Sequence, residues 1–258
     1  MALDVRPRPT SPRGEAAWLA DLEARHLADL TFQEVARALR ALSSAYVERR
    51  ARLAQGAALS GAGKRAAFAL FYGPLHFLLL REIVSRLPHA LDSQRTIVDL
   101  GCGTGAAGAA WASACRRPPH VVGIDRHPWA IAEAARTYRT FGIPARTERG
   151  IVGVCRLPKA PASLVAAFTV NELDDATRGA LLRQLLECVN RGDRVLVVEP
   201  IARSVAPWWG EWRAAFEGVG GRADQWRVPA HLPPIVAKLD RAAGLNHREL
   251  TGRSIFAG

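Results

Sequence analysis

Lysine is scarce in this sequence, and cysteine pairs and long apolar runs are missing. Only three lysines stand beside 32 arginines, and 24 acidic residues leave a formal net charge of +11. The arginines are spread along the whole chain, so the charge does not mark one nucleic-acid surface, and RNA contact stays open. No run reaches the ~18 apolar residues of a membrane helix. The nearest candidate, FALFYGPLHFLLL at 68–80, is interrupted by Gly73-Pro74, so we expect no membrane partner.

The four cysteines form no metal-binding or redox pattern. Cys102, Cys115, Cys155 and Cys188 lie far apart, and neither a C-x-x-C pair nor a His/Cys cluster with zinc spacing occurs. We therefore expect inert thiols, a reducing compartment and no metal site. The first residues, MALDVRPRPTSPRG, contain no apolar segment of the kind found in signal peptides. These observations favour a cytoplasmic protein.

The chain divides near residue 91 into a helical part and an alternating part. Residues 1–14 are predicted to form a flexible leader, 15–91 a helical N-terminal cap, and 92–258 the main domain. In the cap, Thr31 and Glu34 form a capping box that begins a helix. Gly73-Pro74 is predicted to break the chain. The predicted cap helices are 15–28, 32–54, 65–72 and 76–87.

After residue 95, short apolar runs alternate with helical patterns, which predicts a mostly parallel sheet with helices on both faces. The predicted strands are 96–100, 120–124, 145–149, 164–170 and 194–198, with a last strand in 249–257. The predicted helices are 106–114, 128–141, 176–190, 207–216 and 233–243.

The stretch IVDLGCGTGA at 97–106 follows the first of these strands and fits the nucleotide-binding pattern G-x-G-x-x-G/A. Gly101 lets the chain turn, Gly103 leaves room for a ligand beside the backbone, and Gly105 allows the next helix to pack closely. The pattern alone is weak evidence, because a pyrophosphate or a carboxylate suits such a helix start equally well.

Two acidic residues beside this loop narrow the choice of ligand. Asp99 precedes the first glycine, where a carboxylate repels a pyrophosphate but accepts a hydrogen bond from an ammonium group. Asp125, at the end of the second predicted strand, can accept both hydroxyls of a ribose. Together they suit S-adenosylmethionine, although Arg126 leaves open a cofactor with a 2′-phosphate and thus an NAD(P)-dependent oxidoreductase.

The motifs VDLGCGTG and GID resemble the first two motifs of the class I S-adenosylmethionine-dependent methyltransferases. This resemblance covers roughly residues 92–258. It implies a Rossmann-like, doubly wound α/β fold with a seven-stranded sheet in the order 3-2-1-4-5-7-6, whose last-numbered strand is antiparallel. It also implies that Asp99, Gly101, Gly103 and Gly105 line the methionine part of the cofactor and Asp125 the ribose. The family usually has an acidic residue after the third strand, and here either Glu148 or a backbone group takes that place.

The methyl acceptor is expected at the carboxyl edge of the sheet, where open α/β sheets bind ligands. Asn171 and Glu172 follow the fourth predicted strand, so they are our candidates for holding the acceptor and for general-base catalysis. Three further residues are candidates for binding the substrate, namely Tyr72, His76 and Trp208. Glu199, which closes the fifth predicted strand, can also reach this edge.

The helical cap, the VDLG motif and the sequence NEL at 171–173 also resemble the methyltransferase-like assembly proteins of mitochondrial small ribosomal subunits and their bacterial relatives. This chain lacks the cysteine-rich iron–sulfur segment of that group. The main hypothesis is therefore methyl transfer to rRNA or a small molecule, and the alternative is a non-catalytic RNA-binding assembly factor. An oxidoreductase ranks last, because Asp99 disfavours a pyrophosphate.

Overall fold

The computed structural model describes residues 12–48, 59–91, 95–158, 161–202 and 206–258. Seven strands in these ranges form one sheet in the order β3-β2-β1-β4-β5-β7-β6. The first five strands pair in parallel, and β7 is antiparallel to both β5 and β6. The strands are β1 (Thr96–Leu100), β2 (Val121–Asp125), β3 (Ala145–Arg149), β4 (Ala162–Ala167), β5 (Arg194–Glu199), β6 (Arg222–Pro229) and β7 (Glu249–Ala257). This topology confirms the predicted fold class.

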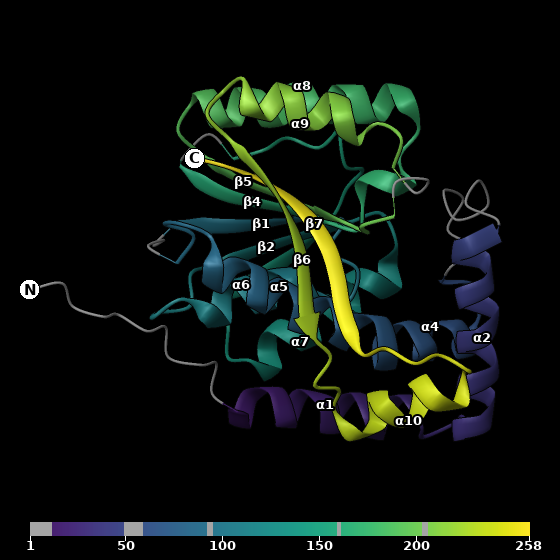
Figure 1. The fold of residues 1–258 in the computed structure, drawn as a ribbon. Coiled ribbons are helices and arrows are strands. Elements are labelled where there is room, and N and C mark those ends of the chain that lie inside the picture. The colour runs from purple at the N-terminus through teal and green to yellow at the C-terminus, as the bar shows by residue number, and fades with distance from the viewer. Residues whose placement is uncertain (1–11, 49–58, 92–94, 159–160, 203–205) are drawn as a thin grey trace, which may run out of the picture.

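Helices cover both faces of the sheet (Figure 1). One layer consists of α8 (Asp175–Asn190) and α9 (Trp209–Glu217), and the other of α5 (Gly73–Arg86), α6 (Ala106–Ala114) and α7 (Pro128–Thr140). Two hydrophobic clusters fill the spaces between the sheet and these layers. The central parallel strands β1, β4 and β5 are buried on both faces and consist mainly of apolar residues, whereas β3 at the edge of the sheet is polar and largely exposed.

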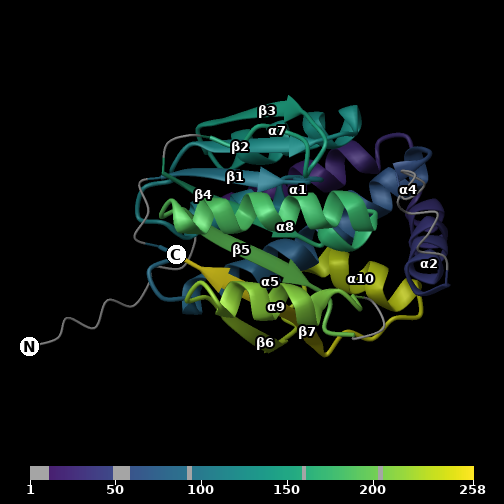
Figure 2. The ribbon, with the colours of Figure 1, turned by 90° about the horizontal axis from the view of Figure 1, so that it is seen from above.

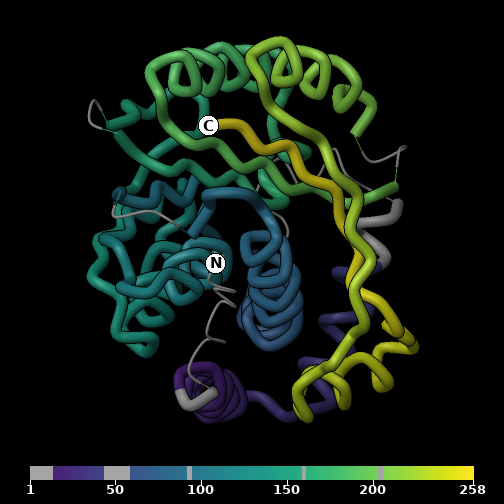
Figure 3. The backbone as a smooth tube through the Cα atoms, turned by 60° about the vertical axis from the view of Figure 1, so that its left-hand side comes forward, coloured from purple at the N-terminus to yellow at the C-terminus, as the bar shows by residue number. Residues whose placement is uncertain are grey.

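The carboxyl ends of the parallel strands point toward two helices of the N-terminal region, α2 (Phe32–Glu48) and α4 (Ala62–Ala67) (Figure 2). The helix that continues from α4 into α5 lies on the concave side of the twisted sheet (Figure 3). Two other helices, α1 (Pro12–His26) and α10 (Pro234–Ala242), lie outside this layer. The segment predicted as a cap thus supplies α5 to the sheet's own covering layer.

The N-terminal helices begin close to where the sequence predicts. The capping box forms as expected, since the Thr31 amide donates to Glu34 Oε2 at 2.8 Å and the Glu34 amide donates to Thr31 Oγ1 at 3.3 Å. The first helix begins at Pro12, inside the predicted leader, whereas residues 1–11 lie outside the described residues. The end of the predicted helix 32–54 also lies outside the described residues.

The predicted break at Gly73-Pro74 is wrong, because the helix runs on from Ala62 to Arg86. A π-helical turn, η2 (Phe68–Tyr72), precedes the pair, and the Gly73 amide donates to the Phe68 carbonyl five residues back. Proline lacks an amide hydrogen and clashes with the carbonyl four residues before it, so the wider turn accommodates Pro74. This segment is long and apolar enough to cross a membrane, but 72% of its most apolar window is buried, as in a core helix.

Two differences concern the strands. The edge strand β6 was not predicted from the residues themselves, because its sequence RADQWRVP has few apolar positions and is exposed along much of its length. The fourth strand is shifted toward the N-terminus, and Val170 belongs instead to a short 3-10 helix, η3 (Val170–Glu172). That 3-10 helix places Asn171 and Glu172 at the carboxyl edge of the sheet.

Candidate functional site

The glycine loop turns sharply between β1 and α6. Gly101 has φ +68°, and a Cβ there would lie 2.5 Å from Thr169 Oγ1, so only glycine fits. Gly105 has φ +77°, and a Cβ there would lie 3.0 Å from Cα of Ala134 in α7. The first glycine therefore brings the loop close to the end of β4, and the last brings two helices together. Gly101 and Gly103 line a cavity, whereas Gly105 lies behind it.

Asp125 ends β2 beside this loop. Its Oδ2 accepts a hydrogen bond of 3.0 Å from the Gly103 amide, and its Oδ1 accepts one of 2.8 Å from the His127 amide. Each carboxylate oxygen keeps a second acceptor site, so the side chain can still accept two hydroxyl groups. Asp125 and Arg126 both line the cavity, and the ribose contact of Asp125 stays a prediction.

Asp99 lies elsewhere than predicted. Its side chain is buried beneath α6, and its Oδ2 accepts hydrogen bonds from the Gly108 amide at 2.8 Å and the Tyr138 hydroxyl at 2.9 Å. Burial raises the pKa of this carboxyl to about 6, although both donors oppose the shift. Asp99 is not among the cavity-lining residues, so its contacts hold α6 and α7 against β1.

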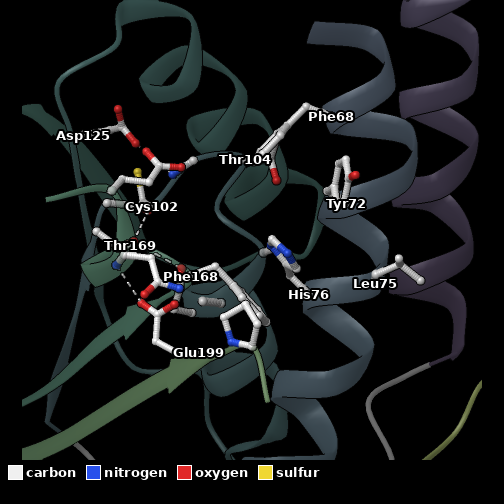
Figure 4. A pocket seen from close by; sticks show the side chains of 18 of the residues that line it. Phe68, Tyr72, Leu75, His76, Cys102, Thr104, Asp125, Phe168, Thr169 and Glu199 are labelled. Atoms are coloured by element: carbon white, nitrogen blue, oxygen red, sulfur yellow. Dashed lines mark hydrogen bonds between the residues drawn. The ribbon is translucent and has the colours of Figure 1, made fainter. Parts of the chain in front are cut away.

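The cavity has a volume of about 660 Å³ and lies between the sheet edge and the helix that continues from α4 into α5. Figure 4 shows its two sides: Phe68, Tyr72 and His76 project from the helix, while Asp125 and Glu199 come from the strand ends. The glycine loop and Asp125 face the aromatic side chains of the helix, and a Cβ built at Gly103 would lie 3.6 Å from the Phe68 ring. The cavity therefore has room for a cofactor and, beside it, an acceptor.

Tyr72 and His76 line the cavity as predicted. The His76 ring stacks on Phe168, with ring centroids 3.9 Å apart and an interplanar angle of 15°. Burial lowers the pKa of His76 to about 3 and raises that of Tyr72 to about 12. Both side chains are therefore uncharged near neutral pH and form a neutral aromatic wall.

Trp208 does not line the cavity, contrary to its predicted position as a pocket wall. Its indole Nε1 instead donates a 3.0 Å hydrogen bond to Oδ1 of Asn171, which does line the cavity. An indole nitrogen can only donate, so the Asn171 oxygen faces Trp208 and its amide nitrogen remains available as a donor. Trp208 therefore positions Asn171 from behind.

Two carboxyl groups of the cavity wall lie at the ends of neighbouring strands. Glu199 is fully buried, and its Oε1 accepts hydrogen bonds from the amides of Val170 at 2.8 Å and Asn171 at 3.3 Å, which anchors the 3-10 helix. Burial raises the pKa of Glu199 to about 8. Burial also raises the pKa of Glu172 to about 7, with nearby Arg126 opposing the shift and Asp125 adding to it. Glu172 can thus exchange a proton near neutral pH.

The segment after β3 closes the cavity beyond Asp125. Gly150, Ile151 and Val152 line it, whereas Glu148 is absent from the lining and its Oε1 accepts a 2.6 Å hydrogen bond from Arg146. Of the two alternatives left open for the family's acidic position, Glu148 thus lies away from the cavity. The other alternative, a backbone group, is left for that position, because residues 150–152 line the cavity.

Several lining residues escaped the sequence prediction. Phe68, Leu75 and Leu79 share one helical face with Tyr72 and His76, and their spacing of three or four residues was a readable signal. His247 and Glu249 come from the C-terminal segment around the start of β7, and no motif marked them. Only the fold brings that segment to the site.

Residues 97–192 match the model of a family described as a methyltransferase domain. No curated protein sequence matches the chain. Among solved structures, the mitomycin 7-O-methyltransferase MmcR is 14% identical, with a TM-score of 0.54, over 94% of this chain and 74% of that one. NcsB1, an O-methyltransferase from neocarzinostatin biosynthesis, is 17% identical, with a TM-score of 0.51, over 97% of this chain and 75% of that one. These two likenesses show the fold.

The sheet order, the glycine loop and the family match define a methyltransferase domain of the Rossmann-like class. Residues 97–192 thus carry a methyltransferase domain, and the protein is an S-adenosylmethionine-dependent methyltransferase. S-adenosylmethionine is its cofactor, so the nicotinamide alternative is set aside. Gly101, Gly103 and Asp125 fit this cofactor, because they bring backbone and carboxylate oxygens to one end of the cavity. When bound, the cofactor supplies an electrophilic methyl group.

Proposed function

We propose that this methyltransferase acts on a small, largely apolar molecule bound beside the cofactor. The observation that carries the proposal is the continuity of the cavity from Asp125 to the aromatic wall of Tyr72 and His76. Its volume of about 660 Å³ lies within the range of roughly 300–1,000 Å³ typical of small-molecule sites. Such a space suits a cofactor and a compact acceptor.

The acceptor half of the cavity is mainly apolar, which supports this choice of substrate. Its walls include Leu75, Leu79 and Phe168, and the imidazole of His76 is neutral. The two structural neighbours also support it: one is named for 7-O-methylation of mitomycin, and the other was crystallised with 2-hydroxy-5-methyl naphthoic acid. An acceptor with a flat apolar body is thus the best match.

In this proposal the protein contributes mainly position. Methyl transfer requires the acceptor atom to approach the methyl carbon in line with the bond that breaks, so orientation accounts for much of the rate. The amide nitrogen of Asn171, held by Trp208, can donate to a polar group of the acceptor. Glu172 can take a proton from the acceptor atom.

RNA is the second candidate acceptor, favoured by the net charge of +11. Phosphate contacts make RNA binding weaken steeply as salt concentration rises. The carboxyl groups of the cavity argue against a polyanion there, so RNA contact would use the outer surface of the protein.

The experiment is tritium transfer from S-[methyl-³H]-adenosylmethionine into a cell extract separated into RNA, protein and small-molecule fractions. We expect label in the small-molecule fraction with the wild type and little with Asp125→Ala. Glu148→Ala is the matched control, because Glu148 is an exposed carboxylate outside the cavity. Label in RNA or protein, or in no fraction, would refute the proposal.

A further inference from the structure

The charge of the cavity is opposite to that of the whole protein. The chain has a net charge of +11, but the charged groups lining the cavity are four carboxyl groups and a single guanidinium, Arg126, among the residues that the structure describes. The carboxyl groups belong to Asp125, Glu172, Glu199 and Glu249. An excess of carboxyl groups in an enclosed space favours a cationic ligand.

Two of these four groups already have partners. Asp125 accepts the amides of Gly103 and His127, and Glu249 forms an ion pair of 3.3 Å with Arg227. Asp125 is therefore held by backbone amides beside the glycine loop, and Glu249 by an arginine of β6. Glu172 remains as the carboxyl group that an acceptor can meet, because Glu199 is fully buried.

Glu199 is the more deeply buried of the two. Its Oε1 accepts two backbone amides, but its buried Oε2 has no hydrogen-bond partner in the structure. A buried oxygen without a partner costs free energy, on the order of 1–3 kcal/mol, unless something pairs with it. The Arg253 guanidinium, on the neighbouring strand, lowers the pKa of Glu199 only slightly against the effect of burial. Because its raised pKa keeps Glu199 protonated near neutral pH, the negative charge of this part of the cavity rests on Glu172.

The helix contributes a second feature that favours a cation. The rings of Phe68 and Tyr72 lie 5.9 Å apart between centroids, and both line the cavity. The faces of aromatic rings attract ammonium groups, particularly where water is excluded. The neutral His76 adds no positive charge that would repel one.

We infer that the acceptor carries an amine nitrogen, bound as an ammonium group by the carboxylate of Glu172 and the rings of Phe68 and Tyr72. This inference rests on the proposed small-molecule function and specifies its substrate class. Arg126 and Asp125 are the other charged groups that act on Glu172, and Glu199 beside it is protonated near neutral pH.

The chemical step balances without any further reagent. The ammonium group first gives one proton to the Glu172 carboxylate, which leaves a nitrogen lone pair. That lone pair forms the bond to the methyl carbon, while the bond from this carbon to the sulfonium sulfur breaks and its electron pair stays on sulfur. The products are a methylated ammonium ion and S-adenosylhomocysteine, and the proton on Glu172 passes to water.

The first test analyses the charge of the tritium-labelled small molecules from the extract. After removal of unreacted cofactor, we expect the labelled product to bind a cation-exchange resin at pH 4, where amines are cationic and neutral ethers are not. Label that passes through the resin would overturn the amine inference but leave the small-molecule function intact. Label in RNA or protein, or no label, would overturn both.

The second test measures binding rather than activity. Melting temperatures are compared with 2-phenylethylamine and with its neutral counterpart 2-phenylethanol, because a ligand that binds the native state raises the melting temperature. At pH 8 we expect the amine to give the larger increase, and Glu172→Gln to remove the difference while Glu148→Gln keeps it. The difference should also shrink as the pH falls below about 7, where Glu172 becomes protonated. Equal shifts for both compounds, including no shift, count against the inference.

Discussion

Replacement of Gly101 by alanine tests how the glycine loop is held against the end of β4. The new Cβ would lie 2.5 Å from Thr169 Oγ1 and closer still to its Cγ2, at a position with φ +68°. A left-handed backbone costs about 1–2 kcal/mol for alanine, and the overlap adds about 1–3 kcal/mol. The expected loss of stability is therefore roughly 2–5 kcal/mol, which lowers the melting temperature of a chain of this size by roughly 10 °C.

Gly142→Ala is the matched control. Gly142 has a similar φ of +65°, but no atom lies within 4 Å of a Cβ built there. It should therefore show only the backbone cost of about 1–2 kcal/mol and bind S-adenosylmethionine normally. Gly101→Ala should in addition weaken that binding at least tenfold in calorimetry, because Gly101 lines the cavity.

The double variant Gly101→Ala, Thr169→Ala separates the overlap from other effects. Removal of the Thr169 Oγ1 and Cγ2 takes away the two nearest atoms, so urea unfolding should reveal a favourable coupling of about 1–3 kcal/mol between the two sites. The reasoning is refuted if the coupling is near zero, or if Gly101→Ala is no more damaging than the control.

Three further substitutions test the site. Asp125→Ala should weaken S-adenosylmethionine binding at least tenfold in calorimetry, while Glu148→Ala should change it less than twofold; equal effects would contradict the ribose role of Asp125. The pKa of Glu199 is about 8 in the folded protein and about 4.5 in the unfolded chain. The free energy of unfolding that comes from the protonated Glu199 is therefore fully present below about pH 4.5 and is lost as the pH rises through 8. Glu199→Gln should therefore flatten the fall in urea stability between pH 6 and 9, and an unchanged slope would count against this explanation. Trp208→Phe removes the donor to Asn171 and should cost about 1 kcal/mol in the same assay, together with weaker acceptor binding; no change would show that this hydrogen bond does not matter.

The cofactor half of the site was readable from the sequence because its signals are local. Gly101 and Gly103 lie two residues apart in one loop, and Asp125 ends the very next strand, so the order of elements brings them together. Asp99 shares the same motif but lies beneath α6, because successive residues of a strand point to opposite faces. The spacing alone did not reveal which face carries the ligand.

The acceptor half depended on contacts between distant segments. Gly73-Pro74 reads as a break in the sequence, but the π-helical turn before it keeps the helix continuous, and the missing Cβ of Gly73 leaves room for Thr104 of the glycine loop. Trp208 was expected at the cavity and instead lies behind Asn171. Neither outcome follows from local propensity, because both depend on which side chains meet after folding.

By itself, the sequence determined the alternation of strands and helices, the glycine loop and the carboxylate of Asp125, because each depends on residues close together in the chain. Only the tertiary structure decided that the helix from Ala62 to Arg86 forms one wall of the cavity. It also decided that Glu172 and Glu199 lie at the ends of neighbouring strands. The pKa values of those carboxyl groups are raised by burial, which depends on every element packed around them.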